Sequence, residues 1–87
     1  MNQVDIDKGF PIMKITVNDK DIEIFEGSNI TSLLAQLGIP SGRVVVERNN
    51  AEIISRSKFE EVILNEGDRL EVLNFVGGGL ESNLRRI

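Results

Sequence analysis

The three consecutive glycines Gly77, Gly78 and Gly79 are the residues of this chain whose type and spacing point most clearly to chemistry. They follow the strand-like segment 69–76 and precede residues 80–87. Because glycine has no Cβ, such a run can thread a narrow channel and bring a terminal carboxylate to the α-phosphate of a nucleotide. A phosphate-binding loop is disfavoured, since no Gly-Lys-Ser/Thr sequence opens a helix here. A plain flexible linker is the alternative interpretation.

Composition argues against most chemistry carried out by side chains. The 87 residues include no Cys and no His, and Trp and Tyr are also absent. The commonest nucleophile, the commonest acid and base near neutral pH and most zinc-binding schemes are therefore missing. We expect a protein that is not an enzyme and that binds neither a metal nor a cofactor of its own.

Charge and hydropathy indicate the setting of the protein. The net charge of −4 disfavours binding to nucleic acid, which depends on Lys and Arg side chains. Apolar stretches fall short of the roughly 20 residues that a membrane helix needs, and the N-terminus lacks the features of a signal peptide. We therefore predict a cytoplasmic protein that contacts no membrane.

Hydrophobic periodicity predicts the elements that must position the glycines. Alternation with period two over 13–17 and 21–24, on either side of turn residues 18–20, predicts a hairpin. Ile30, Leu33, Leu34 and Leu37 then fall on one stripe of a helix of about ten residues. Ser28 is the expected N-cap of that helix, and Gly38 is expected just beyond its end. Further strands are expected at 44–46, 51–54 and 69–76, with Phe59 turned inward between the last two.

This order of elements predicts an α+β fold of the β-grasp (ubiquitin-like) type. We expect a mixed sheet of four to five strands with one main helix packed on one face, and the last strand running beside the first. Other small α+β sheets share the order, so the pattern permits this topology without proving it. The chain divides into a flexible leader at 1–12, a β-grasp domain at 13–76 and a flexible C-terminal tail at 77–87 that contains the glycine run.

The last strand also predicts a surface for partners. If Leu70 and Val72 face the helix, strict alternation places Leu73 and Phe75 on the opposite face of the sheet, beside the glycines. Large apolar groups in such a place commonly mark a binding site. The alternative is that Phe75 covers the end of the sheet or packs under the leader.

The segment from Met13 to Gly79 resembles the sulfur carrier proteins of thiamine biosynthesis, the ThiS family. This family is related to the small subunit of molybdopterin synthase and to ubiquitin. The matching stretches are Met13-Lys14-Ile15-Thr16-Val17-Asn18, Gly27-Ser28 to Leu33-Leu34, Val44-Val45-Val46-Glu47-Arg48-Asn49, Asn65-Glu66-Gly67-Asp68 and Asn74-Phe75-Val76-Gly77-Gly78-Gly79.

The resemblance implies that the chain is a protein cosubstrate. A ThiF-like enzyme would consume ATP to adenylate the carboxylate of Gly79, and sulfur from a cysteine desulfurase relay would replace AMP to give a thiocarboxylate. A ThiG-like thiazole synthase would then take the sulfur. Gly77 and Gly78 would thread the partner's channel, while Leu73, Phe75 and Val76 would dock the partner.

One departure from the family pattern is that Gly79 is followed by Leu80 and so has no free carboxylate. Removal of residues 80–87 by a protease, an artefact of the gene end and loss of the carrier role are three explanations. A ubiquitin-like interaction module that transfers nothing is the rival function. Carriers for molybdopterin or cysteine synthesis are further alternatives.

Overall fold

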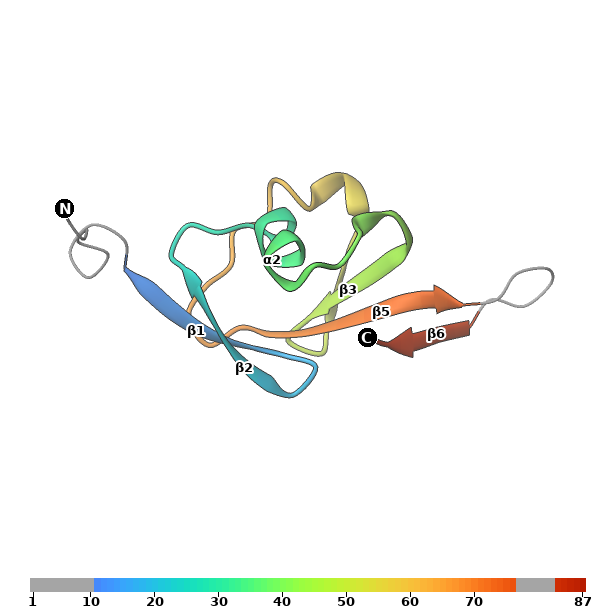
Figure 1. Ribbon diagram of the computed structural model, residues 1–87, viewed down its shortest axis with the longest axis horizontal. Helices are drawn as coiled ribbons and strands as arrows, with labels where there is room; N and C mark the ends of the chain where they lie inside the picture. The colour runs from blue at the N-terminus through green and yellow to red at the C-terminus, as the bar shows by residue number, and fades with distance from the viewer. Residues whose placement is uncertain (1–10, 77–82) are drawn as a thin grey trace.

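The strands of the protein form a single mixed sheet. The structure is a computed structural model that describes residues 11–76 and 83–87. The described strands are β1 (Ile12–Val17), β2 (Lys20–Phe25), β3 (Val44–Arg48), β4 (Glu52–Ile54), β5 (Arg69–Val76) and β6 (Asn83–Arg86). They follow the order β2-β1-β5-β3-β4, and β6 pairs with β5 outside that path (Figure 1). Strands β1 and β5 lie side by side, as predicted, and pair in parallel, while the other pairs are antiparallel.

The β1–β2 and β3–β4 hairpins turn on residues with positive φ. Asn18 and Asp19 join β1 to β2 with φ of 50° and 69°, and Asn49 and Asn50 join β3 to β4 with φ of 55° and 60°. Asn and Asp tolerate the left-handed region better than other residues that carry a Cβ, and two such residues in succession suit a tight hairpin turn. The turn predicted between the first two strands is confirmed.

Helix α2 (Ile30–Leu37) packs its apolar stripe on one face of the sheet, as predicted. The predicted N-cap, Ser28, is wrong: Asn29 is the cap, and its Oδ1 accepts a hydrogen bond from the Ser32 N–H at 2.7 Å. Ser28 is instead held by its backbone, because its carbonyl accepts from the Leu64 N–H at 2.9 Å. Gly38 ends the helix in the left-handed conformation with φ 72°, where a Cβ would be disfavoured.

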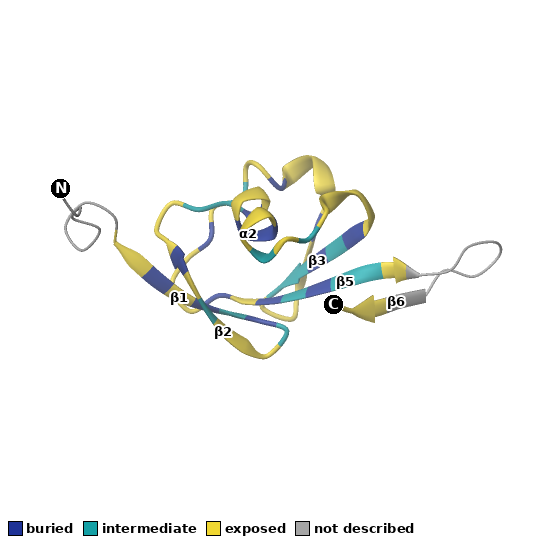
Figure 2. Ribbon diagram, in the orientation of Figure 1, coloured by how far each residue is buried: buried dark blue, intermediate teal, exposed yellow. Residues whose placement is uncertain are grey.

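The core lies between the helix and the sheet, and Figure 2 shows the buried residues gathered there. Two 3₁₀ turns, η1 (Ser41–Arg43) and η2 (Arg56–Lys58), lie in the connections. Phe59, directly after η2, is buried as predicted. The other buried hydrophobic residues are Met13, Ile15, Val17, Ile24, Ile30, Leu33, Leu34, Val44, Val46, Ile54, Leu64, Leu70 and Val72.

The C-terminal segment differs from the expected flexible tail. Residues 83–86 form strand β6, which pairs antiparallel with the second half of β5, from Leu73 opposite Arg86 to Val76 opposite Asn83 (Figure 1). The physical reason is the length of β5. Strand β1 pairs only with Arg69 and Leu70, so the rest of that edge offers unpaired backbone groups that a further strand can satisfy.

Candidate functional site

Strand β5 carries the predicted partner-binding residues toward the glycines. Leu70 and Val72 are buried in the core. Leu73 is half-buried and Phe75 is 39% exposed. The strict alternation predicted for this strand is therefore confirmed, and Leu73 and Phe75 lie on the face away from α2. Their role in docking a partner stays a prediction.

The remaining predicted site residues lie at or beyond the end of β5. Val76 is the last residue of the strand, and its backbone lies opposite Asn83 of β6. Gly77, Gly78 and Gly79 lie outside the described residues, so their predicted roles are not tested here. What the structure does position is the strand that leads into them.

Asn18 links the first hairpin to β5 and to the C-terminus. Its backbone N–H donates to the Leu70 carbonyl at 2.9 Å, which prolongs the ladder between β1 and β5 by one bond. Its side-chain Oδ1 accepts from the Val72 N–H at 2.8 Å, and its Nδ2 donates to the Val72 carbonyl at 3.2 Å. The same Nδ2 donates to the main-chain oxygen of Ile87 at 2.9 Å. The amide of Asn18 thus acts as a short extension of strand β1.

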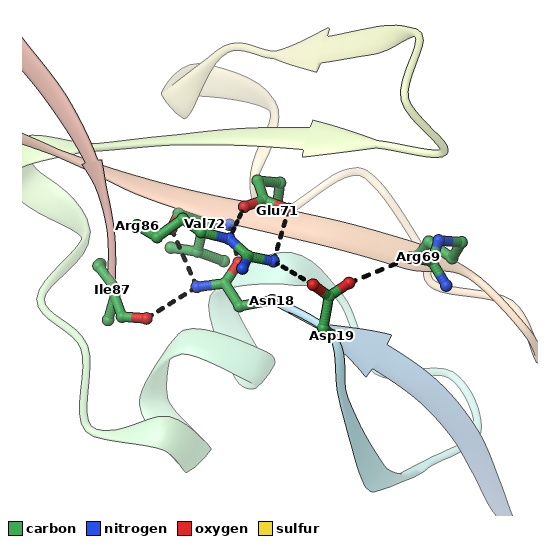
Figure 3. A network of polar contacts seen from close by, with 7 residues as sticks. All are labelled: Asn18, Asp19, Arg69, Glu71, Val72, Arg86 and Ile87. Carbon is green, nitrogen blue, oxygen red and sulfur yellow. Dashed lines mark hydrogen bonds and ion pairs between the residues drawn. The ribbon is translucent and has the colours of Figure 1, made fainter.

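Four charged residues surround the junction that Asn18 forms with Val72 and Ile87 (Figure 3). They are Asp19, Arg69, Glu71 and Arg86. Arg86 donates to both carboxylate oxygens of Glu71, and its Nη2 lies 3.0 Å from Oδ2 of Asp19. Asp19 also accepts from Arg69 at 3.2 Å through its other oxygen. The hydrogen bonds to Glu71, and secondarily those to Asp19, raise the pKa of the Arg86 guanidinium above its ordinary value. Arg86 therefore stays charged and joins β6 to both β5 and the first hairpin.

The sequence pattern does not predict this junction, because Asn18 and Asp19 are typical turn residues and Arg86 falls in the expected flexible tail. The positions of Asn18 and Glu71 beside one another depend on the parallel pairing of β1 and β5, which a local pattern does not encode. The only signal in the sequence is an Asn at the end of a strand, which is common in turns of any kind.

Other classes of site find no support in the part of the chain that the structure describes. Residues 11–76 and 83–87 contain no group of three or more His, Cys, Asp or Glu side chains placed to hold a metal ion. Within the same ranges, no helix is long and apolar enough to cross a membrane.

The fold and the strand that leads to the glycines define a β-grasp protein of the ubiquitin-like class. The sequence profile of the ThiS family matches residues 12–79. The sulfur carrier protein ThiS of Bacillus subtilis is 38% identical over 66 residues, which are 75% of this chain and 98% of that protein. The chain belongs to the ThiS family of sulfur carrier proteins of thiamine biosynthesis.

A solved structure and two longer proteins give further matches. The crystal structure of the thiamine biosynthesis protein ThiS from Geobacter metallireducens is 37% identical, with a TM-score of 0.66, over 77% of this chain and all of that one. The thiazole synthases of Paramagnetospirillum magneticum and Magnetococcus marinus are 39% and 40% identical over 67 residues. Those residues are 77% of this chain, which spans about one fifth of each synthase.

Proposed function

We propose that this chain carries sulfur as a thiocarboxylate on Gly79 and donates it for thiazole formation in thiamine biosynthesis. The observation that carries the proposal is that the match to the ThiS family ends at Gly79. Strand β5 supports it, because the strand runs from the centre of the sheet and ends at Val76, directly before the glycine run.

The chemistry requires no side chain of this protein. A carboxylate is a poor electrophile, so a ThiF-like enzyme would first transfer the AMP group of ATP to the Gly79 carboxylate, with pyrophosphate as the leaving group. A persulfide of a cysteine desulfurase relay would then attack the carboxyl carbon and displace AMP, and a thiol would reduce the S–S bond of the resulting acyl persulfide, which releases the thiocarboxylate and leaves a disulfide. The protein would be a cosubstrate of these enzymes and would bind no cofactor of its own.

The last partner would be a thiazole synthase. Two proteins of that name contain a segment similar to this chain, which favours direct contact between carrier and synthase. Leu73, Phe75 and Val76 would dock the partner beside the tail, and Gly77 and Gly78 would pass through its channel, since residues without a Cβ leave the backbone narrow.

Leu80 sets a condition on this function. Gly79 is joined to Leu80 by a peptide bond, so adenylation requires that this bond first be hydrolysed. A protease that cuts there would create the carboxylate that the activating enzyme needs. The cut would also separate β6 from the rest of the chain.

Mass spectrometry of the intact protein tests the proposal. The full chain and a chain ending at Gly79 are incubated with ATP, cysteine, a thiol reductant, a ThiF-like enzyme and a cysteine desulfurase. We expect only the chain ending at Gly79 to gain the mass of a sulfur-for-oxygen exchange, and protein isolated from cells making thiamine to include that species. Finding only full-length chain in such cells would remove the carrier function.

The rival function, a ubiquitin-like module that transfers nothing, is favoured by one observation: the chain continues past Gly79 into an ordered strand. It predicts that thiazole formation is unaffected when Gly79 is replaced. Carriers for molybdopterin or cysteine synthesis would instead transfer sulfur normally to a different acceptor enzyme, which a reconstituted assay with each acceptor distinguishes.

A further inference from the structure

The edge of β5 beyond Leu70 offers a row of backbone groups to an extended chain. Val72 presents both its N–H and its carbonyl to this edge, where Asn18 and Ile87 bind them. Because alternate residues of a strand direct their backbone groups to the same side, Asn74 and Val76 present theirs to this edge as well. Strand β6 fills the row from Leu73 to Val76.

Two flanking features make the edge selective for the segment that fills it. On the face away from α2, the carboxylates of Glu71 and Asp19 bind the guanidinium of Arg86. On the opposite face, Ile87 lines a groove of about 420 Å³. The apolar residues of that groove include Ile22, Leu37 and Ile39, which are only partly buried. Successive residues of the segment thus meet an acidic pair and an apolar groove.

We propose that this edge is a docking site for an extended segment of a partner protein, with an arginine that pairs with Leu73 and binds Glu71 through its guanidinium, and an apolar residue directly after it. Strand β6 occupies the site within this chain. The site adjoins Leu73 and Phe75 and lies on the strand that leads to Gly77, so a docked partner would lie beside the tail. The inference rests on the proposed function for the identity of the partner, and the docking site itself does not depend on Gly79.

The covalent link gives β6 an advantage over any partner. A segment tethered by a short connection competes at an effective concentration in the millimolar range. A partner therefore gains the edge when β6 is weakened, displaced or cut away. Strand β6 would thereby cover the docking edge until the bond between Gly79 and Leu80 is cut.

Hydrogen exchange in the full chain tests whether Arg86 holds β6 on the edge. Arg86→Ala is compared with Arg85→Ala, which removes the same charge from the neighbouring residue. Arg85 is exposed and has no ion pair with any residue in the described ranges. We expect Arg86→Ala to speed exchange of the Asn74 amide about threefold to tenfold. The Leu73 amide, which faces β3, should be unchanged in both variants.

A peptide supplied separately tests the site itself. The chain is ended at Ser82, which keeps the bond between Gly79 and Leu80 and removes β6. The core residues all lie between Met13 and Val72, and the whole Geobacter ThiS chain matches without such a segment, so this shorter chain should fold. The probe is the synthetic peptide Leu-Glu-Ser-Asn-Leu-Arg-Arg-Ile, followed by NMR shifts of the Asn18 side chain and the Asn74 amide.

We expect binding in the millimolar range, weakened at least about threefold by Arg86→Ala in the peptide and unchanged by Arg85→Ala. Equal affinity of the two variant peptides, shifts elsewhere on the protein, or no shift at about 10 mM peptide would each overturn the proposal. Failure of the proposed function is separable, because a chain ending at Gly79 would then gain no sulfur even though the peptide still binds.

Discussion

Phe75→Ala separates a partner-binding role of Phe75 from a structural one. Phe75 is 39% exposed at the end of β5, on the face away from the helix. If a thiazole synthase docks there, it covers apolar area that the folded carrier leaves in water. The substitution removes that area and leaves the buried core of the protein intact.

The expected loss of affinity follows from the exposed area. A phenylalanine side chain has about 200 Å² of surface, so the exposed fraction of Phe75 with β6 in place corresponds to roughly 80 Å², and a chain without β6 exposes at least that much. At about 25 cal/mol per Å², covering this area contributes about 2 kcal/mol. A loss of that size raises Kd roughly 30-fold. The free energy of unfolding should fall by at most about 3 kcal/mol, because the fold covers the remaining roughly 120 Å² of the side chain.

Isothermal titration calorimetry of the chain ending at Gly79 against a thiazole synthase measures this change. Ile53→Ala is the matched control: Ile53 is 64% exposed on the edge strand β4, which β3 separates from β5. By its pairing with Glu47 it lies on the same face as Phe75. The control should change Kd less than about twofold. A Phe75→Ala variant that stays folded and binds within about twofold of the parent would refute the docking role.

Three further predictions concern the elements that hold the site. Asn29→Ala should lower the free energy of unfolding by about 1 kcal/mol, measured by urea titration, because the cap bond to the first turn of α2 is lost. Gly38→Ala should cost about 1 kcal/mol in a thermal melt; a Cβ would meet nothing within 4 Å, so an effect near zero would show that the left-handed backbone carries no strain. Asp68→Ala should cost about 2 to 3 kcal/mol, because it leaves the Asn65 N–H without its acceptor and removes one of the two carboxylates that pair with Arg48. Asp68→Asn should recover part of that loss, and equal stability of both variants would contradict the argument.

The amphipathic patterns of the sequence correctly predicted the elements of the domain. Alternation fixed which residues of β1 and β5 face the core, because a strand with one buried face requires it. The helix stripe was equally clear. The cap was less so, because Ser28 and Asn29 are both good N-cap residues, and the choice depended on where Leu64 binds the Ser28 backbone.

The C-terminal strand could not be predicted in the same way. Residues 83–86 have no alternating apolar pattern and two adjacent arginines, so local preference indicates no strand. The segment becomes a strand because backbone groups at the edge of β5 pair with its own backbone groups. That edge is open because β1 ends its pairing at Leu70. How far β1 pairs along β5, a strand distant from it in sequence, is a property of the folded sheet.

The sequence by itself determined the glycine run, the absence of Cys and His and the peptide bond between Gly79 and Leu80, because these are facts of covalent structure. Local patterning also determined the hairpins, the helix and the two faces of β5. Only the tertiary structure decided that Asn18, Asp19, Glu71 and Arg86 meet where β6 pairs with β5. The reason is that this meeting requires a parallel pairing between strands some fifty residues apart, which no local pattern specifies.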